Sequence, residues 1–157
     1  MRLYLARHGE AVPGHIDPDS PLTGAGRADV ERVGLMMAGA MVCFRSVKHS
    51  GKTRARQTAE ILAATAGGNA PVERMDGITP MDHPEPVAAQ IETWTEDTLL
   101  VAHLPFVGRL LGLLVSGDSG GGMAEFGPGC VACLQRMGEG RWSLRWMIGP
   151  ELFLAGQ

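Results

Sequence analysis

Two arginines and two histidines stand where short apolar segments end, and their side-chain types could bind and transfer a phosphoryl group. Arg7 and His8 end the first such segment, Arg54 follows the second, and His103 ends a later one. Arginine offers a planar fork that binds phosphate oxygens in a bidentate manner. Neutral imidazole is a nucleophile near pH 7, because its unperturbed pKa is about 6.5. The set therefore indicates chemistry at an anionic phosphoryl group.

The elements that must position these residues alternate between strand and helix, which predicts an α/β fold with a mostly parallel sheet. Thr23 and Thr53 are expected to cap helices, and Pro105 suits the first position of a third. A hairpin is expected to close the chain. The predicted strands are 2–7, 42–49, 71–75, 98–102, 130–136 and 141–148, and the predicted helices are 25–40, 53–66, 85–94 and 106–115.

The position of the four residues at strand ends carries more weight than any one of them. A single histidine at a strand end is usually structural, and a single arginine at a helix start is usually solvated. In open α/β sheets, however, ligands bind at the carboxyl ends of the strands. His8, Ser50 to Arg54, and His103 all follow such ends, so we expect them to converge.

Composition limits the class of protein. The chain has 157 residues, with 45% hydrophobic and 20% charged residues, which predicts one globular domain over 1–157. A net charge of -3 argues against a nucleic-acid binder. The N-terminal apolar stretch is too short for a signal peptide, and no run approaches the roughly 18 apolar residues that span a bilayer. We therefore expect no membrane association and a cytoplasmic location.

The three cysteines fit a reducing compartment. Cys130 and Cys133 have the spacing of a redox motif, but they lie in a predicted strand, where residues three apart face opposite sides. We therefore expect structural cysteines.

Four ordered segments resemble the histidine phosphatase superfamily, and among its members the SixA-type phosphohistidine phosphatases. They are LARHGEA at 5–11, PLTGAGRADV at 21–30, HSGKTRARQTAEIL at 49–62 and LLVAHLPFVGRLLGLL at 99–114. The likeness covers nearly the whole chain. It implies a three-layer α/β/α fold of the phosphoglycerate mutase-like kind, with one antiparallel strand in a mostly parallel sheet.

The resemblance also implies roles for individual residues. His8 would be the nucleophile that becomes phosphorylated, and Arg7, Arg54 and His103 would complete the phosphate pocket. Gly9 would let the backbone approach the substrate closely. Two arginines and a protonated His103 would supply the positive field without a metal or a cofactor.

Several departures from the family pattern concern the proton donor and the substrate. Members that cleave alkyl phosphates usually carry a glutamate in a longer insert, whereas the equivalent stretch here, 76–85, is short. Glu10 and Asp82 remain as possible acids. Imidazole leaves with less help from an acid than an alkoxide does, so the short stretch favours a phosphohistidine substrate. Gly14 stands where an asparagine is frequent, and Gly51 where proline is usual. The roles of Glu10, His15 and Asp17 stay open.

Several readings therefore remain. The favoured one is a phosphatase acting on phosphohistidine in a protein, of the phosphorelay or phosphocarrier type. A small-molecule phosphomonoesterase of the same superfamily is the first alternative. A mutase is disfavoured, because this chain lacks the insert that would enclose a sugar phosphate. A binding module for a phosphorylated ligand would not need both His8 and His103. A metal hydrolase is disfavoured because the five histidines show no paired ligand spacing. The sequence does not indicate an oligomeric state.

Overall fold

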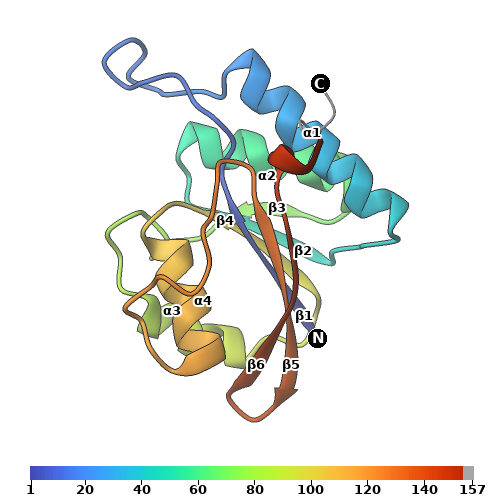
Figure 1. The fold of residues 1–157 in the computed structure, drawn as a ribbon, viewed down its shortest axis with the longest axis vertical. Coiled ribbons are helices and arrows are strands. Elements are labelled where there is room, and N and C mark those ends of the chain that lie inside the picture. Colours follow the sequence, from blue (N-terminus) through green and yellow to red (C-terminus); the bar gives the residue numbers. More distant parts are fainter. Residues whose placement is uncertain (154–157) are drawn as a thin grey trace.

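A computed structural model describes residues 1–153 of the chain, and Figure 1 shows strands alternating with helices before a final hairpin. In chain order the elements are β1 (Arg2–Arg7), α1 (Gly24–Gly39), β2 (Ser46–His49), α2 (Thr53–Ala66), β3 (Val72–Arg74), α3 (Pro84–Glu92), β4 (Thr98–Ala102), α4 (Phe106–Ser116), β5 (Val131–Gly138), β6 (Arg141–Ile148) and the short 3-10 helix η1 (Pro150–Phe153).

Within these residues the strands form one sheet in the order β3-β2-β4-β1-β5-β6. The pairs β3–β2, β2–β4 and β4–β1 are parallel. The pairs β1–β5 and β5–β6 are antiparallel, so β5 alone runs against the others. The predicted fold class, with a mostly parallel sheet and one antiparallel strand, is confirmed.

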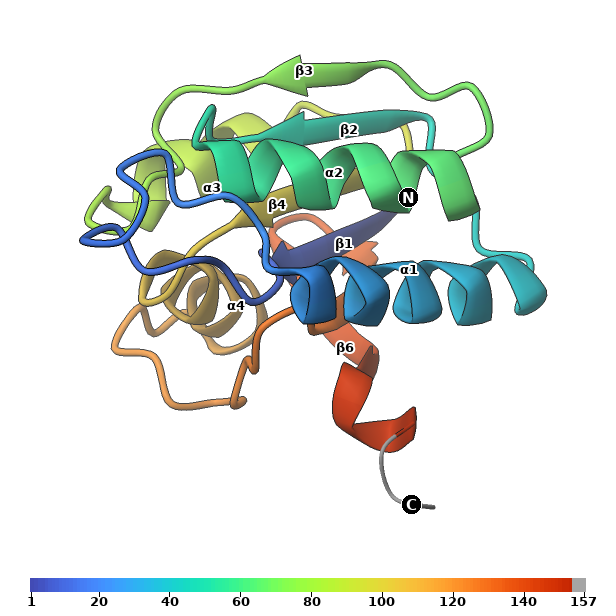
Figure 2. The same ribbon diagram turned by 90° about the horizontal axis from the view of Figure 1, so that it is seen from above.

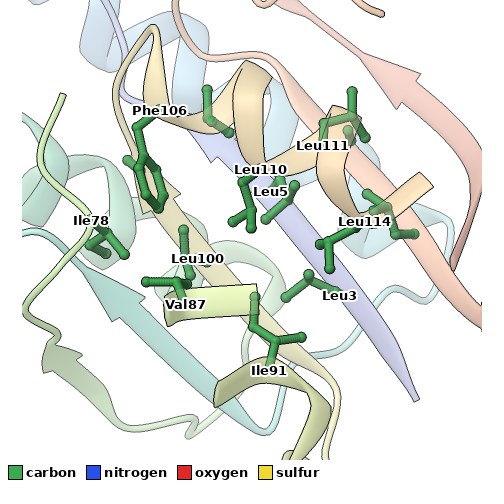
Figure 3. Packing of buried hydrophobic residues seen from close by; sticks show 14 of the residues in the cluster. Leu3, Leu5, Ile78, Val87, Ile91, Leu100, Phe106, Leu110, Leu111 and Leu114 are labelled. Carbon is green, nitrogen blue, oxygen red and sulfur yellow. The ribbon is translucent and has the colours of Figure 1, made fainter. Parts of the chain in front are cut away.

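Helices cover both faces of the sheet, which makes the three layers (Figures 1 and 2). The helices α3 and α4 pack on one face over Leu3, Leu5 and Leu100, as Figure 3 shows. The helices α1 and α2 pack on the other face over Tyr4, Leu99 and other alternate strand residues. Because successive side chains of a strand point to opposite faces, β1 and β4 supply both cores from short apolar runs.

Several bounds shift by one or two residues from the prediction, and three element ends differ in other ways. The strand β2 begins at Ser46 instead of residue 42, because its partner β4 begins only at Thr98, which pairs with Ser46. Thr53 is the first residue of α2 and Lys52 is its N-cap, without a side-chain capping bond. Pro105 is the N-cap of α4 and not its first residue, and the Leu104–Pro105 peptide bond is cis.

Thr23 caps α1 as predicted. Its backbone is extended, and its hydroxyl oxygen accepts from the Gly26 amide at 2.9 Å. This bond satisfies one of the free amides of the first helical turn. The cap also fixes the chain that returns from His8, because the Thr23 amide donates to the Glu10 carbonyl.

The cysteine prediction is also confirmed. Cys130 belongs to the core under α3 and α4, and Cys133 to the core under α1 and α2. Burial raises the pKa of each thiol to about 11, which disfavours the reactive thiolate. No helix among residues 1–153 is both long and apolar enough to cross a membrane.

Candidate active site

The predicted site residues meet at one edge of the sheet, because the three strands that lead to them are neighbours. The strand β4 lies between β1 and β2, with Arg7 opposite Ala102 and His49 opposite Val101. The next residues along these strands are His8, Ser50 and His103. The loops that leave this edge lie together at the left of Figure 2. The expected convergence at the carboxyl ends is therefore what the structure shows.

The two ring nitrogens of His8 have different partners. Nδ1 lies 2.7 Å from the Gly9 carbonyl oxygen, and the Arg54 Nε–H donates to Nε2 at 3.2 Å. A carbonyl oxygen only accepts, so Nδ1 carries the proton and Nε2 holds a lone pair. Partial burial lowers the pKa of His8 to about 4. The hydrogen bond to Gly9 raises this pKa, and the charges of Arg54 and Arg7 lower it by smaller amounts. The imidazole is thus neutral at pH 7, and Nε2 is unprotonated with its lone pair accepting from Arg54.

His103 is buried beside His8, with 5.0 Å between the ring centroids. Its Nε2 lies 2.6 Å from the Ser50 hydroxyl, and its Nδ1 has no partner. Burial, then His8 and the nearby cations, lower the pKa of His103 to about 3. The expectation of a protonated His103 is therefore wrong for the unliganded protein, because burial among positive groups disfavours a further charge.

The two arginines approach from different directions. Arg54 lies in the first turn of α2, where its Nε reaches His8. Arg7 ends β1, and its Nη1 donates to the Phe126 carbonyl at 2.9 Å. The buried Nε of Arg7 has no partner. Burial lowers the pKa of both guanidinium groups, but from values so high that both stay charged.

Gly9 lies against helix α1. A Cβ at this position would lie 2.7 Å from Cγ2 of Val30, so the missing side chain makes room for this helix. The Gly9 amide donates to the Thr58 hydroxyl, which in turn donates to the Arg54 carbonyl. This chain of bonds ties the backbone after His8 to the helix that carries Arg54.

The two possible acids are held by threonines. Asp82 accepts from both the amide and the hydroxyl of Thr79, each at 2.7 Å, and these bonds lower its pKa. An exposed Glu10 accepts from the Thr23 hydroxyl at 3.2 Å. Asp82 thus stabilises its own loop as a carboxylate, which is the wrong protonation state for an acid at pH 7.

Two other polar side chains have structural partners. Arg56 pairs with Glu60 on the surface of α2. Asp17 accepts from the Asp19 amide in the loop after β1, which also carries an exposed His15. Gly51 has a φ of 90°, which proline cannot adopt, and this explains the departure from the family pattern. Among residues 1–153, no group of three His, Cys, Asp or Glu side chains is placed to hold a metal ion.

Sequence reasoning assigned no role to three residues that orient the site. They are Ser50, Thr58 and Phe126, whose hydroxyl or carbonyl groups contact His103, Gly9 and Arg7 respectively. Ser50 carried a signal, because it directly follows a strand end within the segment that resembles the family. The role of Phe126 had none, since a backbone carbonyl can belong to any residue type.

The fold and this arrangement agree with comparisons to known proteins. The model of the histidine phosphatase superfamily (branch 1) matches residues 3–96, and the chain belongs to this family. Within it, the chain resembles the phosphohistidine phosphatase SixA of Escherichia coli (strain K12), with 25% identity over 155 residues that cover 96% of this chain and 94% of SixA. These likenesses support phosphatase activity.

Two solved structures extend the comparison. A structure of the protein histidine phosphatase SixA complexed with tungstate has a TM-score of 0.87 and 25% identity, and covers 98% of this chain and 99% of its own. A putative alpha-ribazole-5'-P phosphatase from Escherichia coli str. K-12 substr. MG1655 has a TM-score of 0.78 at 19% identity, with 96% and 97% covered. The second likeness shows the shared fold alone.

Proposed function

We propose that this protein removes the phosphoryl group from phosphohistidine on a protein, by way of a phosphorylated His8. The observation that carries the proposal is the state of His8: a neutral ring, with Nδ1–H donating to Gly9 and a lone pair on Nε2. Such a nitrogen attacks phosphorus without first losing a proton.

The proposed reaction has two steps. In the first, the His8 Nε2 lone pair forms a bond to phosphorus while the bond to the substrate imidazole breaks, and that imidazole leaves with the electron pair and takes a proton from solvent. In the second, water attacks phospho-His8, the Nε2–phosphorus bond breaks, and inorganic phosphate leaves. In both steps Arg7, Arg54 and His103 would bind the phosphoryl oxygens, where the charge of the transition state is spread.

The substrate class rests on leaving-group chemistry. An alkoxide needs a proton from an acid, whereas imidazole is a much better leaving group. Asp82, one of the two candidate acids, is engaged by Thr79 and its pKa is lowered. An enzyme with this arrangement is better suited to a phosphorus–nitrogen bond than to an alkyl phosphate.

Exposed apolar side chains on the loops at this edge support a protein substrate. They are Ile16 after β1, Met81 after β3, Leu104 after β4 and Met123 before β5, with exposed fractions of 67%, 73%, 38% and 43%. Apolar side chains around a polar site favour contact with another protein surface. A cytoplasmic phosphorelay or phosphocarrier protein is the partner that we propose.

The decisive experiment is the His8→Ala substitution, measured by the release of phosphate from a phosphohistidine-containing carrier protein. We expect no measurable turnover. Wild-type protein quenched during turnover should carry an acid-labile phosphate that the variant lacks. Turnover by His8→Ala at the wild-type rate would refute a phosphorylated His8. Binding without turnover by the wild type would instead support the alternative of a binding module.

Three further measurements test the substrate class and the independence from metal. Ile16→Ser with Met81→Ser should raise KM for the phosphorylated carrier several-fold and leave phosphoramidate hydrolysis unchanged. Met41 is even more exposed but lies away from the site, at the end of α1, so Met41→Ser should change neither. Turnover of alkyl phosphates above that of phosphohistidine would favour a small-molecule phosphomonoesterase. We expect full activity in excess chelator; loss of activity that returns with added metal would contradict the metal-independent reaction.

A further inference from the structure

Ser50 connects the strand β2 to the second histidine of the site. It follows directly after β2 and is 6% exposed. Its hydroxyl oxygen lies 2.6 Å from Nε2 of His103, and the backbone N–H of Lys52 donates to the same oxygen at 3.4 Å. The hydroxyl therefore has two nitrogen neighbours and one proton.

The possible proton arrangements can be counted. The Lys52 amide can only donate, so the Ser50 oxygen accepts from it. A neutral His103 carries one ring proton. If that proton were on Nε2, it would point at the Ser50 oxygen, and the hydroxyl proton would need a third partner. If it is on Nδ1, the hydroxyl proton goes to Nε2, and both Ser50 contacts are satisfied.

The tautomer with the proton on Nδ1 also suits the surroundings of that nitrogen. Nδ1 of His103 is buried without a protein partner, in a ring that lies beside His8 and is influenced by Arg54 and Arg7. With the proton on Nδ1, this side presents a donor to an anionic phosphoryl oxygen. With the proton on Nε2, it would present a lone pair to that oxygen and would repel it.

We propose that Ser50 is a positioning residue that holds His103 in the Nδ1–H tautomer, so that a neutral His103 donates a hydrogen bond to the transferred phosphoryl group. This inference rests on the proposed function, because it assigns His103 the phosphoryl oxygen as its acceptor. It differs from a cationic second histidine, since its donor persists across neutral pH without protonation of the ring.

The tautomer can be read from ring ¹⁵N chemical shifts of His103 in the unliganded protein, with His103→Gln to assign the signals. We expect the wild type to show Nδ1–H. In Ser50→Ala the Nε2–H form should appear, because the ring has lost the donor to Nε2. Nε2–H in the wild type, or the same tautomer in wild type and Ser50→Ala, would overturn the inference.

Kinetics supply a second readout. Ser50→Ala should lower kcat/KM for the phosphohistidine protein about tenfold to a hundredfold, as expected when the group that orients a reacting residue is lost. Ser50→Thr keeps the hydroxyl and should recover most of the activity. Thr98→Val is the matched control, since it removes another buried hydroxyl at the opposite end of β4. Equal kcat/KM for Ser50→Ala and the wild type would contradict the role of Ser50.

The two proposals can fail separately. The ¹⁵N measurement uses the resting protein and needs no turnover. A His8→Ala enzyme that stays active would therefore refute the phospho-His8 reaction without contradicting the Nδ1–H tautomer of His103. Conversely, loss of activity in His8→Ala together with Nε2–H in the wild type would retain the reaction and refute the role of Ser50.

Discussion

His8 and His103 lie side by side, but their contacts give them opposite tasks. A carbonyl accepts from Nδ1 of His8 and leaves Nε2 with a lone pair. A hydroxyl contacts Nε2 of His103 and leaves Nδ1 free. One ring thus presents a nucleophilic nitrogen to the space where a phosphoryl group would lie, and on our proposal the other presents a donor.

The lowered histidine pKa values predict an acid-sensitive protein. His8 has a pKa of about 4 in the folded chain, against about 6.5 when unfolded. Below pH 6.5 the unfolded chain therefore binds more protons, so the free energy of unfolding falls as the pH decreases from about 6.5 to about 4 and levels off below the folded pKa. We expect His8 to account for roughly 2–3 kcal/mol of the loss between pH 7 and pH 4.5, and His103 to act in the same direction.

Urea unfolding at a series of pH values checks this expectation. His8→Asn removes the titrating ring, so the pH dependence of its unfolding free energy should be shallower than that of the wild type by this amount. Identical pH dependence in the two proteins would mean that the pKa of His8 is not lowered in the folded state.

The geometry of the arginine fork is expected to matter more than its charge. Arg54→Lys keeps the positive charge but loses the rigid planar fork that would let one N–H reach His8 Nε2 while others bind a phosphoryl oxygen. We expect kcat/KM to fall about tenfold to a thousandfold. Arg56→Lys, two residues further on α2, is the matched control and should retain wild-type activity. A fully active Arg54→Lys enzyme would show that charge alone suffices.

For single residues, type and position predicted which side chains meet at the site. They did not predict the protonation state of His103 or the hydrogen bonds that orient the site. His8, Arg54 and His103 could be placed together because each follows a strand that has a definite place in a parallel sheet. The neutral state of His103 could not, because it depends on how deeply the ring is buried and on the four ionisable groups around it, which are His8, Arg54, Lys52 and Arg7. The bond from Arg7 to the Phe126 carbonyl depends on the path of a loop for which glycine-rich sequence gives no unique conformation.

Among the elements, the contact of α1 with α2 determines how tightly the loop after His8 is held. The two helices touch at Gly34, where an added Cβ would lie 2.0 Å from the Thr65 hydroxyl oxygen. A second close approach lies at Gly26, where a Cβ would lie 2.2 Å from the Glu10 carbonyl oxygen. Glycines on this face of α1 thus allow the helix to lie against both α2 and the site loop.

Gly34→Ala should therefore destabilise the protein even though alanine favours helices. Overpacking of this kind costs about 1–3 kcal/mol. Gly39→Ala at the end of the same helix meets no atom within 4 Å, and it should be neutral or stabilise by up to about 1 kcal/mol. Urea midpoints of the two variants give the comparison, and the double substitution with Thr65→Ala should recover part of the loss. Equal midpoints for Gly34→Ala and Gly39→Ala would contradict this packing.

Element types were predictable from the sequence, and their ends were less so. The apolar run 98–102 forms the buried strand β4 as predicted, and Thr23 caps α1 because its local geometry decides the cap. The start of β2 is set instead by its neighbour β4, and no local signal in residues 42–45 reports where a distant partner begins. Tertiary pairing thus overrode a run of β-forming residues.

For the molecule as a whole, one sheet separates two hydrophobic cores, and we expect the two cores to unfold together. Adjacent residues of β1 belong to opposite cores, Leu3 and Leu5 to one and Tyr4 and Ala6 to the other. Loss of β1 would therefore expose both cores at once. This arrangement supports the prediction of a single domain over 1–157.

Two tryptophans allow that prediction to be tested. Trp142 is buried in the core under α3 and α4, and Trp146 packs against the other core. Variants that keep only one of these tryptophans should show urea transitions whose fluorescence and circular dichroism midpoints coincide. Separate midpoints for Trp142 and Trp146, measured against the circular dichroism of the same variant, would divide the chain into two unfolding units.

The parallel pairing of β1 with β4 also has a consequence for the order in which the protein folds. Their ladder joins Leu3 to Thr98 and Arg7 to Ala102, so most of the chain must be in place between them. Contacts of such wide sequence separation form slowly, because a long loop must close before they are gained. His8 and His103 extend this same ladder. In refolding experiments, enzymatic activity should therefore return with the slowest major phase, after the helices have formed.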